Sequence, residues 1–167
     1  MALAMVAYLS DEDEPVSPVL RDAGPQETDE AVGPPAEPSS PRGTVLVVDD
    51  DVSLRDSVAD ILHYAAYSVL KAADGDEALE VLSQQSVDVL ILDLAMPIRD
   101  GLSVLEALGP PPPPKVIVIS AFAYYSPEDI DRMGLGSKVT RSLRKPCQPV
   151  ELLAAVNDAM DELERED

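Results

Sequence analysis

The sequence has one cysteine, no tryptophan and a single phenylalanine, and each shortage narrows what the chain can be. With Cys147 as the only thiol, no intramolecular disulfide can form, which is typical of proteins in a reducing cytoplasm. Aromatic residues make up 4% of the chain and hydrophobic residues 46%, so the core must be built from aliphatic side chains. The apolar opening stretch is far shorter than the ~20 residues of a membrane span, and it lacks the basic start of a secretory signal. We therefore expect a cytoplasmic protein with no membrane anchor.

Basic residues are also scarce. The chain holds 12 lysines and arginines against 32 acidic residues, which gives a net charge of -20. Because nucleic acids and anionic membrane surfaces are bound through Lys and Arg, this composition argues against direct binding to either. An acidic surface that simply aids solubility is the plainest interpretation of the charge.

Residues 1–43 lack any sustained apolar period. They contain seven prolines, nine acidic residues and two arginines. A segment of this composition cannot bury enough apolar area to offset the entropy lost on ordering. We therefore predict a disordered, acidic, proline-rich leader over residues 1–43 and one domain over residues 44–167.

The rest of the chain alternates between short apolar runs and helical patterns. The runs are apolar on both faces, which is typical of buried parallel strands, and the helical patterns repeat every 3.6 residues. Strand–helix alternation repeated five times predicts an α/β fold, a doubly wound parallel sheet with helices on both faces. The five runs are Thr44–Val48, Tyr67–Lys71, Val87–Leu92, Val116–Ile119 and, less clearly, Thr140–Leu143.

Polar side chains follow four of these five runs. Asp49 and Asp50 come after the first run and Asp93 after the third. Ser120 follows the fourth run, and Lys145 lies just beyond the fifth. In parallel sheets of this kind ligands bind beyond the carboxyl ends of the strands. These side chains are therefore candidates for one shared site.

Three carboxylates in one site repel one another. At about 4 Å each pair costs roughly 1 to 4 kcal/mol, so counter-charge is needed. Lys145 supplies one positive charge, and a divalent cation would supply the rest; ligands that are all oxygens favour Mg²⁺. Carboxylates that only cap a helix are an alternative for Asp50 and Asp51. That alternative does not explain Asp93, which lies between two leucines in an apolar run, so we predict a magnesium site.

Five stretches of this chain resemble the response-regulator receiver family, in the family's order. The resemblance covers residues 44 to about 164. The matching stretches are Val45–Asp51, Leu90–Pro97, Asp100-Gly101, Val118–Ala121 and Lys145-Pro146.

The resemblance implies a fold and a metal site. The fold would be a five-stranded parallel sheet of the flavodoxin-like order 2-1-3-4-5. Asp49 and Asp50 would hold Mg²⁺ together with Asp93 and the backbone carbonyl of Ala95.

The resemblance also implies roles in phosphoryl transfer. Asp93 would be the phosphoacceptor, and Lys145 would contact the phosphoryl oxygens. Ser120 would hydrogen-bond the phosphoryl group and so couple it to the fourth strand and helix. The Lys145–Pro146 bond would be cis.

Together these roles imply a stand-alone response regulator of a two-component phosphorelay. It would accept a phosphoryl group from the phosphohistidine of a histidine kinase or phosphotransfer protein, and act on a downstream protein target. It would catalyse only its own phosphorylation and dephosphorylation, and so would not be an enzyme in the ordinary sense. Homodimers are common in this family, although nothing in the sequence demands one.

Two positions depart from the family's pattern. Ser142 stands where many receivers have an aromatic residue that swings inward on activation, and Tyr124 or Tyr125 is a candidate substitute. Ala66 stands where a glycine usually ends the first helix. If Ala66 adopts a left-handed conformation, the cost is about 1 kcal/mol.

A cluster of basic residues near the predicted fifth strand stands out in so acidic a chain. Two interpretations are open, a solvated face and a docking surface for an acidic partner or the chain's own leader. The cluster consists of Arg132, Lys138, Arg141 and Arg144.

Two other functions stay open. A phosphohydrolase resembling the haloacid-dehalogenase superfamily would use Asp49 as its nucleophile, in the pattern Asp49-x-Asp51-x-Ser53, but would give Asp93 no role. A receiver-fold binding module that is not phosphorylated is the second alternative.

Overall fold

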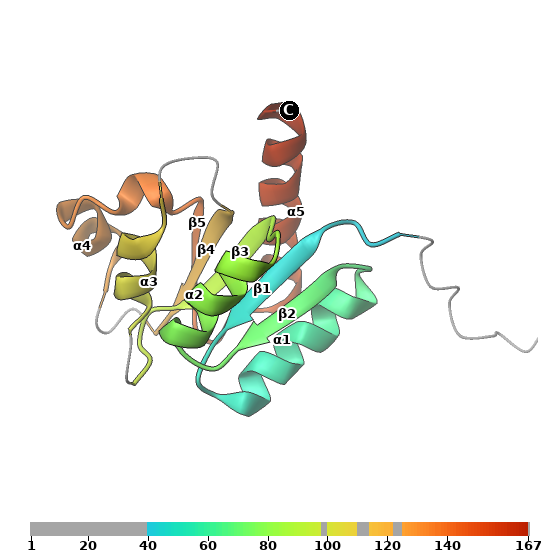
Figure 1. Ribbon diagram of the computed structural model, residues 1–167, viewed down its shortest axis with the longest axis horizontal. Helices are drawn as coiled ribbons and strands as arrows, with labels where there is room; N and C mark the ends of the chain where they lie inside the picture. The colour runs from blue at the N-terminus through green and yellow to red at the C-terminus, as the bar shows by residue number, and fades with distance from the viewer. Residues whose placement is uncertain (1–39, 98–99, 110–113, 122–124, 167) are drawn as a thin grey trace, which may run out of the picture. The chain divides into compact units, whose positions relative to one another are not determined.

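The computed structural model describes residues 40–97, 100–109, 114–121 and 125–166. Most of the predicted leader lies outside the described residues. The five strands form one parallel sheet in the order β2-β1-β3-β4-β5, which confirms the predicted fold class (Figure 1). The strands are β1 (Thr44–Val48), β2 (Ser68–Ala72), β3 (Val89–Asp93), β4 (Lys115–Ser120) and β5 (Arg141–Arg144).

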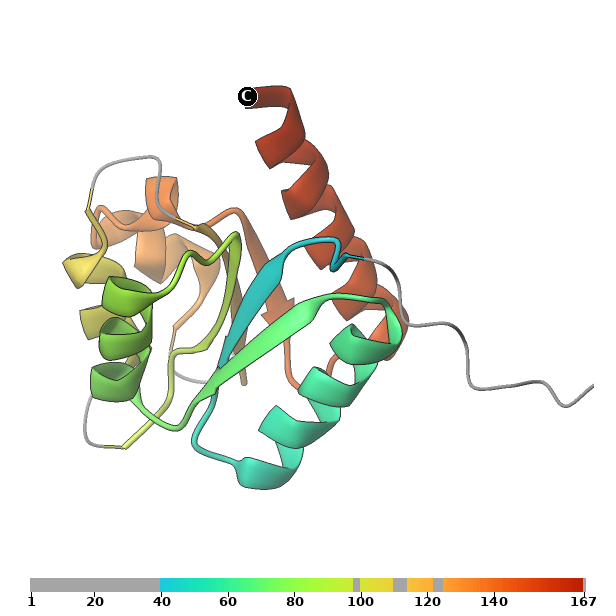
Figure 2. The ribbon, with the colours of Figure 1, turned by 45° about the vertical axis from the view of Figure 1, so that its right-hand side comes forward.

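Helices cover both faces of the sheet. Helices α1 (Val52–Tyr64) and α5 (Pro149–Glu166) pack on one face. Helices α2 (Gly75–Gln84), α3 (Gly101–Ala107) and α4 (Pro127–Arg132) lie on the other, as Figure 2 shows. A single 3₁₀ turn, η1 (Gly136–Lys138), leads from α4 towards β5.

The core is aliphatic, as the scarcity of aromatic residues predicts. Strands β1 and β3 lie in the middle of the sheet and are buried almost throughout, because helices cover both of their faces. Their side chains alternate between two apolar clusters, one under α2 and α3 and the other under α1 and α5. Tyr67 is a buried exception, and its hydroxyl donates to Asn157 Oδ1 at 2.6 Å. The buried centre of the sheet thus leads directly to Asp49 and Asp93, the first pair of predicted site residues.

Ala66 adopts the left-handed conformation that its position suggests, with φ at 67°. Glycine carries no Cβ and tolerates this conformation, so the Ala66→Gly variant should raise the free energy of unfolding by about 0.5–1 kcal/mol. Ala65→Gly is a matched control, because Ala65 has an ordinary φ of -84° and glycine there should lower stability by a similar amount. Urea unfolding of both variants measures the two effects. A loss of stability in Ala66→Gly would contradict the expectation.

No helix among the described residues is both long and apolar enough to cross a membrane.

Candidate functional site

Two aspartates at the carboxyl ends of the central strands form the buried part of the site. Asp93 is the last residue of β3, and Asp49 directly follows β1, its neighbour in the sheet. Both side chains are almost withdrawn from water, with Asp49 6% and Asp93 5% exposed. Since burying a carboxylate is unfavourable unless it is paired and hydrogen-bonded, each needs partners.

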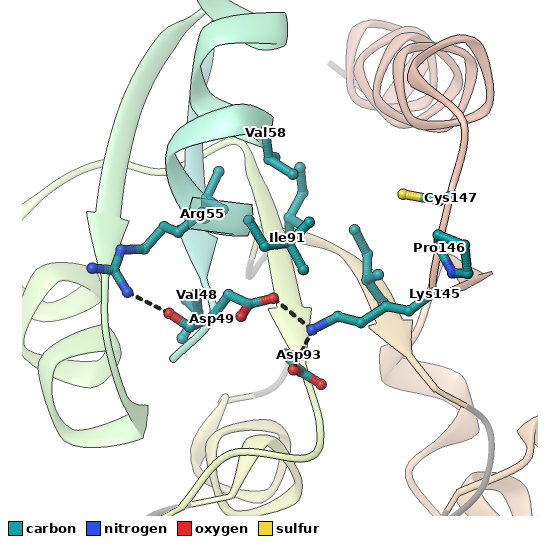
Figure 3. Close-up of a pocket in the computed structure, with 12 residues that line it drawn as sticks. Val48, Asp49, Arg55, Val58, Ile91, Asp93, Lys145, Pro146 and Cys147 are labelled. Carbon is teal, nitrogen blue, oxygen red and sulfur yellow. Dashed lines mark hydrogen bonds and ion pairs between the residues drawn. The ribbon is translucent and has the colours of Figure 1, made fainter. Parts of the chain in front are cut away.

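Lys145 bridges the two buried carboxylates. Its Nζ donates to Asp49 Oδ2 at 2.7 Å and to Asp93 Oδ2 at 2.5 Å (Figure 3). Its backbone N–H donates to the carbonyl of Ser120 at 2.9 Å, which carries the pairing of β5 with β4 one residue beyond the strand. The bond between Lys145 and Pro146 is cis, as the family resemblance implies.

Backbone amides hold the remaining oxygens of the same two carboxylates. The N–H of Asp51 donates to Asp49 Oδ1 at 2.9 Å, and the N–H of Ala95 donates to Asp93 Oδ1 at 2.9 Å. Each buried carboxylate therefore has one oxygen on a backbone amide and the other on the Lys145 ammonium. This arrangement fixes both side chains in position.

Burial and pairing act in opposite directions on the protonation of these groups. Burial raises the pKa of Asp49 above its usual value, although the hydrogen bonds from Lys145 and Asp51 lower it. For Lys145, burial lowers the pKa, but the hydrogen bonds to Asp49 and Asp93 outweigh burial and the net shift is upward. The site therefore holds a charged ammonium at neutral pH.

A third carboxylate completes an acidic cluster. Oxygen atoms of Asp49, Asp50 and Asp93 lie within 4.8 Å of one another. Asp50 is exposed, so the cluster opens to solvent on that side. An all-oxygen donor set of three carboxylates with one exposed member fits Mg²⁺, which keeps several of its waters when bound to protein. Three of the four predicted metal ligands, Asp49, Asp50 and Asp93, thus lie together. For the fourth, Ala95, the structure shows the contact of its amide with Asp93.

Ser120 ends β4 one residue beyond Ile119, the partner of Asp93 across the sheet. It is 2% exposed, and its hydroxyl has no hydrogen-bond partner among the residues that the structure describes. A buried hydroxyl without a partner costs free energy, so such a group in a native fold calls for an explanation. An acceptor atom of a bound ligand would supply the missing partner.

The first residue of α3, Gly101, approaches the site closely. A Cβ on this residue would lie 2.3 Å from the carbonyl oxygen of Asp93. Since the obstacle is backbone and cannot turn aside, only glycine fits at this position without a shift of the strand end. Gly101 thus allows the start of α3 to pack against Asp93.

Arg55 is a site residue that the sequence reasoning missed. Its Nη1 donates to the backbone carbonyl of Asp49 at 2.5 Å (Figure 3). This bond ties α1 to the acidic loop, the three aspartates Asp49–Asp51 between β1 and α1. The one available signal is a basic residue in the first turn of the helix that follows the aspartates. That signal does not distinguish an arginine that turns inward from one that faces solvent.

The basic cluster near β5 is mostly engaged within the fold. Arg132 pairs with Asp129 at 2.6 Å and Arg141 with Asp158 at 3.3 Å. Lys138 Nζ donates to three carbonyls at the carboxyl end of α3, those of Leu105, Glu106 and Leu108. These contacts favour the interpretation as a structural, solvated face over a docking surface.

Ser142 lies half-buried on β5, where it pairs with Val118 of β4. Tyr124 lies outside the described residues. Tyr125 packs against the apolar cluster under α2 and α3.

Comparison with known proteins agrees with this geometry. Residues 45–157 match the family described as the response regulator receiver domain. Over 113 residues the chain is 34% identical to the transcriptional regulatory protein CpxR of Escherichia coli K12, covering 67% of this chain and 47% of that protein. The chain spans about half the length of the curated relatives it matches.

Solved structures show the same fold. A CheY-like receiver domain protein of Methanospirillum hungatei superposes with a TM-score of 0.68 at 28% identity, covering 75% of this chain and 98% of that one. The response regulator TrrA of Thermotoga maritima, solved in complex with Mg²⁺ and BeF, gives a TM-score of 0.62 at 26% identity, over 70% of this chain and 98% of that one.

Proposed function

Since the chain belongs to the response regulator receiver domain family of two-component systems, we propose that it is a switch that accepts a phosphoryl group on Asp93. The donor would be the phosphohistidine of a histidine kinase or a phosphotransfer protein. One observation carries this proposal: Asp93 is a nearly buried carboxylate that shares Lys145 with Asp49 and lies within 4.8 Å of two other acidic side chains.

In the proposed transfer one bond to phosphorus forms as another breaks. A carboxylate oxygen of Asp93 forms a bond to phosphorus while the bond from phosphorus to the donor imidazole breaks, and the imidazole nitrogen takes up a proton. Because the transition state of phosphoryl transfer is loose, catalysis consists mainly of positioning and charge stabilisation. Asp49, Asp50, Asp93 and the carbonyl of Ala95 would hold Mg²⁺, which neutralises charge on the phosphoryl oxygens when bound.

The other side chains act on the product. Lys145 already lies on Asp93 Oδ2, so its ammonium needs only a short movement to contact a phosphoryl oxygen. Ser120 would donate its hydroxyl to a second phosphoryl oxygen. Because Ser120 ends β4, this bond would couple the phosphoryl group to the fourth strand and helix and pass the signal to a binding surface.

We extend the proposal to the partners of the chain. The net charge of -20 favours a downstream protein target over nucleic acid, and the phosphoryl group would come and go without turnover of another substrate. A cytoplasmic location is part of the same proposal. The structure argues against the haloacid-dehalogenase alternative, whose pattern includes Asp51 as well as Asp49. Asp51 is exposed, and its carboxylate already caps α1 at the amides of Ser53 and Leu54.

Incubation with acetyl phosphate and Mg²⁺, read by intact mass, tests the proposal. We expect one added phosphoryl group per chain, and none when EDTA removes the divalent cation. A chain that stays unmodified with Mg²⁺ present, while a known receiver domain is modified in the same tube, would favour the alternative of a binding module that is not phosphorylated.

A further inference from the structure

An apolar cavity lies behind the acidic site, between α1 and the loop that joins β5 to α5. Its volume is about 290 Å³. The sheet supplies one wall, and α1 and the segment Lys145–Cys147 supply the others (Figure 3). The apolar side chains that line it are Val47, Val48, Leu54, Val58, Ile91, Ile119, Pro146 and Cys147.

The cavity is partly open to solvent, but its walls are mainly apolar. Protein interiors are packed as densely as organic crystals, with few voids larger than a water molecule. A dry apolar cavity of about 150 Å³ is enough to bind benzene. The cavity behind the acidic site is larger than that. Small side chains such as those of Val58 and Cys147 line it and do not fill it.

The charges at the rim indicate which ligand the cavity prefers. Four charged residues line it: Asp49 and Asp93 are acidic, and Arg55 and Lys145 are basic. Their formal charges cancel, and the ammonium and both carboxylates are already paired with one another. The other eight lining residues are apolar, so an ion in that part of the cavity would lose its hydration without gaining a partner there. An uncharged molecule therefore loses the least hydration free energy when it enters the cavity.

We propose that this cavity binds a small, uncharged, mainly apolar molecule of one or two rings. The proposal has a regulatory consequence, which rests on the function proposed for Asp93. Lys145 and the two residues after it form one wall, so an occupant would restrain the lysine that must move to meet the phosphoryl group. Occupancy would therefore slow phosphorylation.

Indole is a suitable probe, because it is uncharged and of the right size. In the full-length chain, its addition should shift methyl NMR signals of the cavity residues Leu54, Val58 and Ile91 and leave those of the opposite apolar cluster, such as Val104, in place. It should also slow alkylation of Cys147, the only thiol of the chain, relative to a free thiol in the same solution. Shifts spread over the whole surface, or no shift and no protection, would overturn the proposal.

A variant that fills the cavity provides the decisive comparison. Val58→Phe should weaken indole binding at least about tenfold, because the added ring occupies the same space. Val52→Phe is the matched control: it adds the same ring to the same helix at an exposed position and should leave binding unchanged. If Val58→Phe does not fold, Leu54→Phe replaces it. Equal indole affinity in a folded filled variant and in the wild type would contradict the proposed site.

The same titration separates this inference from the proposed function. Indole binding in a chain that acetyl phosphate does not modify would retain the cavity site and reject the role of Asp93. Phosphorylation in a chain that does not bind indole would retain the role of Asp93 and reject the cavity site. Binding that leaves the phosphorylation rate unchanged would reject the regulatory consequence alone.

Discussion

The Asp93→Asn variant should take up no phosphoryl group from acetyl phosphate under conditions in which the wild type takes up one. The substitution keeps the size of the side chain but replaces the attacking carboxylate with an amide, which is a poor nucleophile. It also leaves a donor–donor contact, because an amide NH₂ must face either the Ala95 N–H or the Lys145 ammonium. Intact mass after incubation with Mg²⁺ measures the uptake.

Asp51→Asn is the control for this experiment. Asp51 lies in the acidic loop next to the site, but it is exposed and its carboxylate caps α1. Asparagine is as good an N-cap as aspartate, so this variant should fold and take up phosphate at nearly the wild-type level. Full uptake by Asp93→Asn together with loss of uptake in Asp51→Asn would point to a different acceptor.

Replacing Lys145 with methionine should lower the free energy of unfolding by about 3 kcal/mol when no divalent cation is present, since removing one partner of a buried ion pair typically costs 3–5 kcal/mol. The variant leaves two nearly buried carboxylates that face each other without the ammonium between them. Mg²⁺ should recover part of the loss, because it supplies the missing positive charge. Urea unfolding with EDTA and then with Mg²⁺ measures both effects.

Arg141→Met serves as the comparison for Lys145→Met. Arg141 makes a single ion pair with Asp158, and both side chains are about half exposed. Exposed pairs contribute at most about 1 kcal/mol, so Arg141→Met should change stability little and should not respond to Mg²⁺. Equal losses of unfolding free energy in the two variants would show that the Lys145 bridge stabilises the fold no more than an exposed ion pair does.

The sequence predicted the strands and the convergence of the site residues, but not the ends of every strand. Runs of aliphatic residues revealed the central strands, because strands buried on both faces cannot contain polar residues at every second position. The fifth strand, Arg141–Arg144, is exposed at both ends and was predicted less clearly. The ends of the strands were less certain: Tyr67 was expected to begin the second strand, which instead runs from Ser68 to Ala72. The expectation that Asp49, Asp93 and Lys145 converge followed from the topology alone, since parallel strands end at one edge of the sheet.

Contacts that depend on side-chain direction were beyond the sequence. Nothing in the spacing of residues shows that Lys145 reaches both carboxylates at once or that Arg55 turns inward to the carbonyl of Asp49. The partner of Arg141 is Asp158 on α5, and the sequence does not show which face of that helix meets β5. Arg132 pairs instead with Asp129 on its own helix, a contact that the spacing of three residues allows. Cavities escape sequence reasoning for the same reason, because they depend on how side chains from separate elements meet.

The most direct measurement is the position of the phosphoryl group on the chain. Sodium borohydride reduces an aspartyl phosphate to homoserine, so treatment of the phosphorylated protein followed by peptide mapping marks the acceptor. The mark should fall on Asp93 and on no other aspartate. A mark on Asp49 or Asp50, or phosphate retained as a stable ester elsewhere, would contradict the role of Asp93.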